Sequence, residues 1–109
     1  MPLATIDDKL IRYVTDTIVE HFHPRRIILF GSHARGDAHP DSDLDLLIEM
    51  ETDLSFYERM RRVDEVFESR SWPMDLLVYT PAEVQEERTK VYSIVKIAER
   101  EGRVLYDAR

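Results

Sequence analysis

Apolar residues recur at helical spacing near the start of the chain. The repeating positions are Ile6, Leu10, Tyr13, Val14, Thr17, Ile18 and Phe22. This period predicts an amphipathic helix over residues 6–22. Thr5 and Asp8 are placed as a capping box at its start. His23-Pro24 ends the helix, because the residue before a proline is disfavoured in the helical conformation.

Shorter apolar runs predict the strands of a sheet. A continuous β-branched and aromatic run covers residues 26–30 and stops at Gly31-Ser32, as expected of a buried strand. Residues 43–49 predict a second strand, in which alternate side chains face the same side. Residues 74–79 predict a third strand, after the break at Trp72-Pro73, and residues 104–106 a short edge strand.

Two further segments predict helices. The first covers residues 54–69, where Tyr57, Met60, Val63, Val66 and Phe67 mark one face. The second begins at Thr80-Pro81 with a capping glutamate at Glu83. It runs in one piece or two toward Glu101, with Gly102 as its C-terminal cap, and its expected core residues are Tyr92, Ile94, Val95 and Ile97. The order α-β-β-α-β-α-β predicts an α/β (α+β) fold, a small mixed β-sheet with flanking helices.

Composition narrows the function. A chain of 109 residues suits a single domain over 1–109. The absence of cysteine excludes disulfides and thiolate chemistry. Neither a membrane span nor a leader segment is visible, so we expect a cytoplasmic protein. The net charge of −7 argues against general nucleic-acid binding, which needs a basic surface. An acidic protein that handles a polyphosphate needs a divalent cation between the two.

Three aspartates carry the candidate chemistry. Asp43 and Asp45 project from one face of a strand, roughly 6–7 Å apart along it. Asp75 opens another strand, which could lie roughly 5 Å away in the same sheet. Carboxylates at the same end of adjacent strands can hold two Mg²⁺ ions roughly 3.5–4 Å apart for phosphoryl chemistry. Aspartate is depleted in strands, so this cluster needs a reason.

A glycine-serine turn lies ten residues before the aspartate pair. Gly31 ends a buried strand, where a glycine permits positive φ or a close approach to phosphate. Ser32 offers a hydroxyl and an amide at the start of a short helical turn, which suits an anion. Gly-Ser, ten residues, then Asp-x-Asp resembles the signature of the DNA polymerase beta-like nucleotidyltransferases. The longer form, Gly-Ser-x-Ala-Arg-Gly followed by Ser-Asp-x-Asp, is similar to the minimal nucleotidyltransferases of prokaryotes.

The resemblance covers nearly the whole chain and implies roles for individual residues. Asp43 and Asp45 would bind both Mg²⁺ ions, and Asp75 would complete the site as a metal ligand and candidate base. Gly31 and Ser32 would hold the terminal phosphates of ATP. The match includes Arg35, which contacts phosphate or braces the loop, and Ser42, which is assigned to nucleotide binding.

The resemblance also implies a partner. Larger members of the superfamily add a domain that grips the acceptor, and the predicted elements here leave no room for one. Minimal nucleotidyltransferases commonly pair with a helical HEPN-type toxin and can place AMP on a tyrosine of it. Two alternatives stay open: a non-catalytic antitoxin that acts by contact, and a homo-oligomeric enzyme for a small acceptor such as an aminoglycoside. Each proposed site residue could instead have a purely structural role. Asp43 and Asp45 could mark a solvent-facing strand start and Asp75 a turn, while Ser32 could cap a helix and Arg35 form an ion pair.

Overall fold

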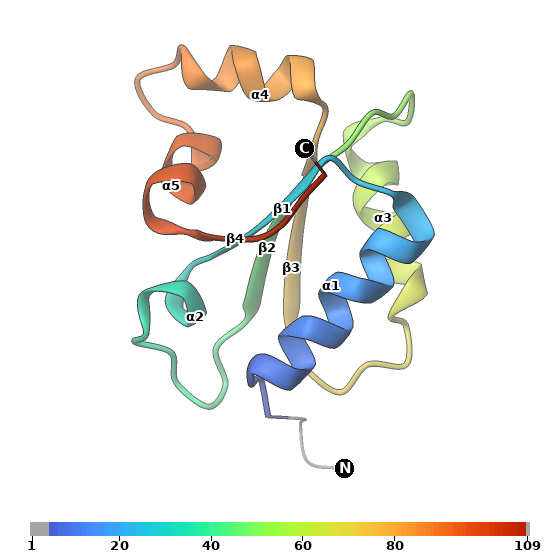
Figure 1. The fold of residues 1–109 in the computed structure, drawn as a ribbon, viewed down its shortest axis with the longest axis vertical. Helices are drawn as coiled ribbons and strands as arrows, with labels where there is room; N and C mark the ends of the chain where they lie inside the picture. Colours follow the sequence, from blue (N-terminus) through green and yellow to red (C-terminus); the bar gives the residue numbers. More distant parts are fainter. Residues whose placement is uncertain (1–4, 109) are drawn as a thin grey trace.

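The computed structural model describes residues 5–108, in which a four-stranded sheet lies between two layers of helices (Figure 1). The elements in chain order are α1 (Asp8–Phe22), β1 (Arg26–Phe30), α2 (Ser32–Arg35), β2 (Leu44–Glu49), α3 (Phe56–Val66), β3 (Met74–Tyr79), α4 (Pro81–Arg88), α5 (Ile94–Glu101) and β4 (Arg103–Asp107). This order confirms the expected α/β (α+β) class with a small mixed sheet.

Helix α1 begins slightly later than expected. The N-cap is Asp7, whose carboxylate accepts the amide of Leu10 at 2.9 Å, so the predicted capping box of Thr5 and Asp8 is wrong. Asp8 lies inside the first turn, where its charge favours the positive end of the helix dipole. At the other end, His23 has a φ of 48° and its amide bonds to the Val19 carbonyl. A left-handed residue before a proline ends the helix.

The sheet has the strand order β3-β2-β1-β4. Strand β1 is antiparallel to both of its neighbours, whereas β2 and β3 are parallel. A parallel pair needs a crossover connection, and α3 supplies it. The parallel pairing matters for the site, because it brings the starts of β2 and β3 to the same end of the sheet.

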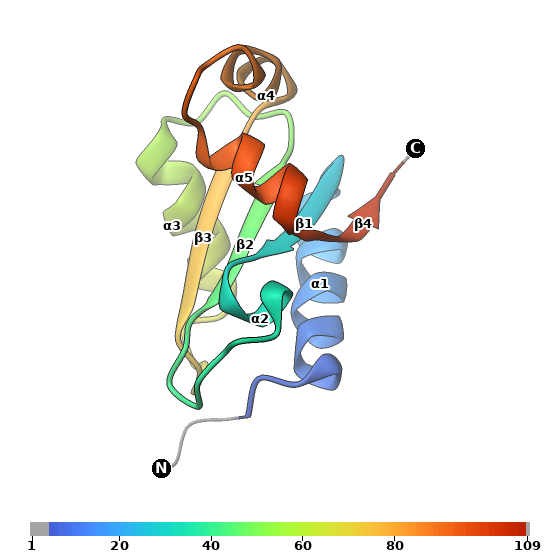
Figure 2. The same cartoon turned by 90° about the vertical axis from the view of Figure 1, so that its left-hand side faces the viewer.

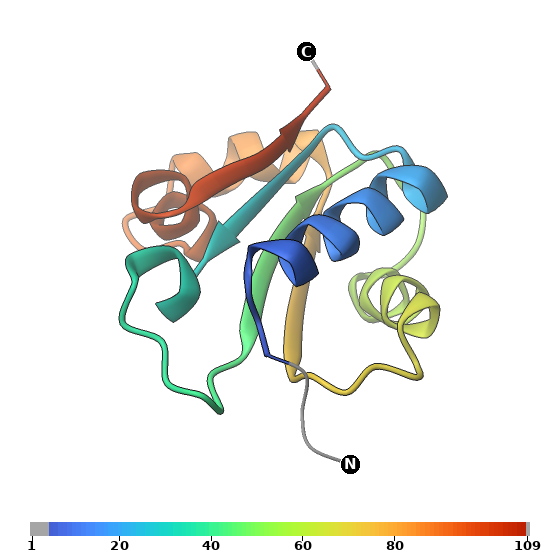
Figure 3. The ribbon, with the colours of Figure 1, turned by 60° about the horizontal axis from the view of Figure 1, so that its bottom comes forward.

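Each face of the sheet has its own apolar core. Alternate strand residues such as Leu46 and Val78 face α1 and α3, while Leu47 faces α4 and α5. Figure 2 looks onto the second face, with α5 and α2 in front of the strands, and Figure 3 shows the two helical layers on opposite sides. Within residues 5–108, no helix combines the length and the apolar character that a membrane span requires.

The segment after β3 forms two helices rather than one. Thr80 and Glu83 make the predicted capping box of α4, and Ser93 caps α5 by accepting the amide of Val95. Two residues expected in the core are exposed: Tyr92 is 89% exposed, in the α4–α5 connection, and Ile97 is 38% exposed. The expectation was wrong for both.

Gly102 is the C-cap of α5, as expected, but its backbone is extended rather than left-handed. It is needed for space, since a Cβ there would lie 2.6 Å from the Leu29 carbonyl oxygen. The turn from α5 into β4 therefore passes closer to β1 than a residue with a side chain would permit.

Candidate functional site

The three aspartates lie at one end of the sheet. Asp43 immediately precedes β2, Asp45 is its second residue, and Asp75 is the second residue of β3. Asp45 and Asp75 are direct partners in the parallel register, so the two side chains leave neighbouring strands on the same face. Asp45 is partly buried, whereas Asp43 and Asp75 are exposed. The predicted neighbourhood of β2 and β3 is confirmed.

The glycine turn closes against the middle aspartate. Phe30, the last residue of β1, pairs with Asp45, so the chain leaves the sheet at Gly31 beside this carboxylate. Gly31 has a φ of 75°, which favours glycine. A Cβ at this position would overlap Oδ2 of Asp45 and lie 3.0 Å from its Cγ. The glycine is required both by conformation and by contact with the carboxylate.

A single helical turn, α2, follows the glycine. The amides of Ala34 and Arg35 both bond to the Gly31 carbonyl at 3.1 Å. The first amides of a helix have no partner within it. In α2 these are the amides of Ser32 and His33, which directly follow the glycine packed against Asp45. Arg35 is exposed and forms an ion pair with Asp37 at 3.3 Å. This contact lies within the loop, as expected if Arg35 braces it. Whether Ser32 and Arg35 also bind nucleotide stays a prediction.

A histidine links this turn to the loop before β2. Nε2 of His33 lies 3.3 Å from the carbonyl oxygen of Ser42, and because a carbonyl only accepts, Nε2 donates. The Ser42 hydroxyl accepts the His39 amide at 2.8 Å, so it closes the loop, and its assignment to nucleotide binding stays a prediction. From the sequence, His33 reads as a commonplace loop histidine that could ligate a metal, and its contact with Ser42 has no signal in the spacing.

Electrostatics single out Asp45. Its pKa is raised from 3.8 to about 6, first by burial, then by the charges of Asp75 and Asp43. His33 and Arg35 act in the opposite direction and lower it. Like charges placed close together disfavour ionisation, and a nearby cation favours it. The raised pKa therefore marks a carboxylate that lacks sufficient positive charge around it.

The three carboxylates are the kind of ligand that hard divalent cations prefer, although their side chains do not form a coordination shell in this arrangement. Within residues 5–108, no three His, Cys, Asp or Glu side chains form a group that could hold a metal ion as they stand. Carboxylates without a cation repel one another, and two of the three, Asp43 and Asp75, are exposed. Oxygen ligands on adjacent strands are those that Mg²⁺ uses. The residues fit the metal chemically, and their roles as ligands stay a prediction.

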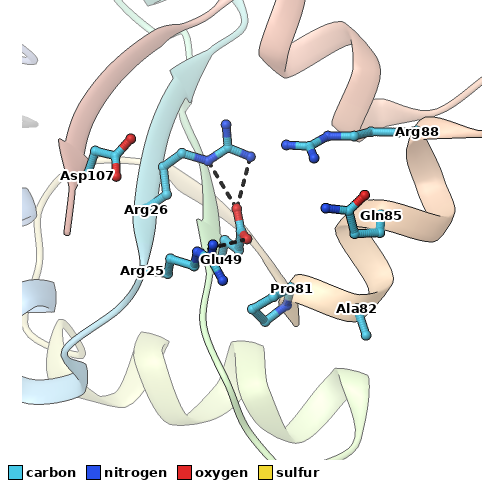
Figure 4. Close-up of a pocket in the computed structure, with 8 residues that line it drawn as sticks. All are labelled: Arg25, Arg26, Glu49, Pro81, Ala82, Gln85, Arg88 and Asp107. Atoms are coloured by element: carbon cyan, nitrogen blue, oxygen red, sulfur yellow. Dashed lines mark hydrogen bonds and ion pairs between the residues drawn. The ribbon is translucent and has the colours of Figure 1, made fainter. Parts of the chain in front are cut away.

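A separate polar cavity lies at the opposite end of the sheet (Figure 4). It encloses about 350 Å³ and is bordered by Arg25, Arg26 and Glu49. Glu49 is buried and bonded by Arg26 at 2.9 Å, and Arg26 also reaches Glu99 at 2.8 Å. Glu49 lies four residues beyond Asp45, about 13 Å along the strand. This network ties α5 to the sheet and is distinct from the aspartates.

Comparison with family models gives a match over most of the chain. A family model described as a nucleotidyltransferase domain matches residues 11–105. No match was found among curated proteins.

Solved structures share the fold at low sequence identity. One is a putative nucleotidyltransferase from Sulfolobus solfataricus, 21% identical, with a TM-score of 0.64 over 92% of this chain and 79% of that one. Another is a mutant of the MntA-HpeT toxin–antitoxin, 17% identical, with a TM-score of 0.64 over 95% of this chain and 75% of that one. A third is a toxin–antitoxin with AMP-PNP, 18% identical, with a TM-score of 0.56 over 90% and 74% of the two chains.

Proposed function

This chain belongs to the nucleotidyltransferase domain family, and from that premise we propose that it transfers AMP from ATP to a hydroxyl group of a protein acceptor. The observation that carries the proposal is the register of Asp45 with Asp75 on parallel strands, with Gly31 packed against the Asp45 carboxylate. A family fold alone does not fix an activity. Transfer of a nucleotidyl group needs hydrogen-bond donors for the phosphates beside carboxylates that can hold a metal ion.

Each residue has a defined task in the reaction. Asp43, Asp45 and Asp75 would hold Mg²⁺, which when bound neutralises charge on the triphosphate and on the departing pyrophosphate. The amides of the Gly31–Ser32 turn would bind the terminal phosphates. The acceptor oxygen attacks the α-phosphorus, the bond to the β-phosphate breaks, and pyrophosphate leaves with the electron pair. The acceptor proton passes to the exposed carboxylate of Asp75 or to water.

The acceptor is proposed to be a helical HEPN-type toxin modified on a tyrosine. Two of the structurally similar proteins are toxin–antitoxin complexes, and one of these complexes contains AMP-PNP. Together with the resemblance to minimal nucleotidyltransferases, these similarities favour an antitoxin that acts by modification. The aspartate cluster argues against a purely contact-based antitoxin, because a raised pKa at Asp45 is an electrostatic cost that contact alone does not require.

The test is mass spectrometry of a candidate HEPN-type partner protein, purified and incubated with the chain, ATP and Mg²⁺. We expect a mass increase of one or more AMP units that disappears with Asp45→Asn and with EDTA. Asp16→Asn, an exposed aspartate on α1, is the matched control and should leave the transfer unchanged. Binding of an unmodified partner, with wild type and Asp45→Asn neutralising it equally, would instead establish the contact mechanism.

A further inference from the structure

An apolar surface continues from the aspartates along the same face of the sheet. Leu77 and Tyr79 follow Asp75 on β3 at two-residue steps, so their side chains share its face. Both are only partly buried, and both pack with Ile94 of α5 against the core on this side. Two steps of a strand put Tyr79 about 13 Å from Asp75. Figure 2 shows the lower part of β3 with no helix in front of it.

Helix α5 turns an apolar flank toward this surface. Val95 and Ala98 are buried against the sheet, and Glu99 on one flank bonds to Arg26. A helix advances about 100° per residue, which puts Ile94 and Ile97 on the flank opposite Glu99. Ile94 packs against the same buried cluster as Leu77 and Tyr79 of β3, and Ile97 is 38% exposed. The flank that faces away from the ion network is therefore apolar and open.

The connection between α4 and α5 adds two fully exposed apolar side chains. Val91 is 85% exposed and Tyr92 is 89% exposed. This connection lies beside Tyr79, whose pKa is raised by burial and then by Glu87, and lowered by Lys90. Lys90 forms an ion pair with Glu87. Adjacent large apolar side chains in an open connection cost free energy in water unless something covers them.

We propose that these six residues, Leu77, Tyr79, Val91, Tyr92, Ile94 and Ile97, form the docking surface for the protein acceptor. The inference rests on the proposed function and names the place where its acceptor binds. An apolar segment of the acceptor lies along β3 and α5 and presents its hydroxyl at the aspartate end. The occupant is a protein segment because Leu77 lies one two-residue step from Asp75 on the same face of β3, so a segment that covers the surface can also present a side chain at the carboxylates.

The chemistry of the surface favours a protein over other acceptors. A nucleic acid needs unpaired basic side chains along its path, whereas Lys90, the basic residue of the connection between α4 and α5, is paired with Glu87. A sugar-like or aminoglycoside acceptor is held by hydrogen bonds and carboxylates, and it leaves the apolar run of about 7 Å from Leu77 to Tyr79 unused. Aromatic and aliphatic anchors are typical of a protein interface.

The experiment measures the affinity of this chain for the purified HEPN-type protein without ATP, by isothermal titration calorimetry. Tyr92→Glu and Ile97→Glu should each weaken binding by at least about tenfold, as expected for residues at the centre of an interface. Tyr92→Arg should weaken it too, since the loss comes from the apolar contact and not from the sign of the charge. Binding of a fluorescent ATP analogue with Mg²⁺ should match wild type in all three variants.

The matched control is Val104→Glu, which adds the same charge at a 53% exposed apolar residue of β4, the opposite edge strand. Its affinity should stay within about twofold of wild type, as for a residue outside the interface. Wild-type affinity in the Tyr92 and Ile97 variants, or an equal loss in Val104→Glu, would overturn the docking surface, as would a partner that does not bind.

The outcomes separate the two proposals. A partner that docks through this surface but receives no AMP supports the docking surface and defeats AMP transfer. If the partner receives AMP equally well from Tyr92→Glu and from wild type at limiting concentration, AMP transfer is supported and the docking surface is refuted.

Discussion

Replacing the middle aspartate by asparagine should make the metal-free protein more stable. Asp45 has a pKa of about 6 in the folded protein against 3.8 as its ordinary value. Below the lower value both folded and unfolded states hold the proton, and the carboxyl costs nothing. As the pH rises the unfolded state ionises first, so stability falls until the folded carboxyl has ionised too. Above about pH 6 the penalty is complete.

The size of the effect follows from the same difference. Each pH unit between the folded and unfolded pKa corresponds to about 1.4 kcal/mol, so a difference of about two units gives about 3 kcal/mol. Because Asp45 is only partly buried, solvent screening reduces the expected gain to about 1–3 kcal/mol. The asparagine side chain has nearly the same shape without the charge, so the packing against Gly31 is retained.

The assay is urea unfolding of wild type and Asp45→Asn in EDTA, at pH 8 and at pH 4. The variant should be the more stable at pH 8, and its advantage should shrink toward pH 4 and also in saturating Mg²⁺. Asp16→Asn removes an exposed charge on α1 and should change the free energy of unfolding by less than about 0.5 kcal/mol. An Asp45→Asn protein no more stable than wild type at pH 8 would refute the reasoning.

Three other changes test the packing around the site. Gly31→Ala should lower the free energy of unfolding by about 2–4 kcal/mol, against about 1 kcal/mol for Gly36→Ala. Both glycines have positive φ, but of the two only Gly31 has a neighbour, Asp45, that an added Cβ would overlap. Equal thermal shifts in the two variants would contradict this. Gly102→Ala should cost about 2–4 kcal/mol by overlap with neighbouring carbonyls, measured by urea unfolding. Glu83→Gln should cost about 1–2 kcal/mol at pH 7 by weakening the 2.6 Å pair with buried Arg59. Since the Arg59 hydrogen bond lowers the pKa of Glu83 from its ordinary value of 4.5, this difference should persist above that value and be lost as the pH falls through the lowered pKa.

The sequence determines much of the site because the relevant signals are local. Gly31, Asp43 and Asp45 lie on either side of one loop, and a strand alternates its side chains whatever surrounds it. The position of Asp75 follows from its strand, since a helix between two strands favours parallel pairing. Spacing for Asp43 and Asp45, together with strand order for Asp75, therefore indicates three carboxylates at one end of the sheet.

Other features depend on tertiary contacts that spacing does not reveal. Asp7, rather than Thr5, caps α1, because neighbouring residues with similar capping ability compete and packing decides among them. Tyr92 and Ile97 follow the apolar pattern of a core but lie in and after a break between two helices. Gly102 serves close packing rather than a left-handed turn. The contact between His33 and the Ser42 carbonyl spans a loop and is visible only in the fold.

The proposed function requires Asp43, Asp45 and Asp75 to bind divalent ions beside a triphosphate. This is measured most directly by anomalous scattering from crystals grown with Mn²⁺ and a non-hydrolysable ATP analogue. We expect manganese peaks within coordination distance of all three carboxylates, with the phosphates against the Gly31–Ser32 amides. Manganese bound elsewhere, or an Asp75 carboxylate outside the coordination shell with nucleotide present, would contradict the proposed function.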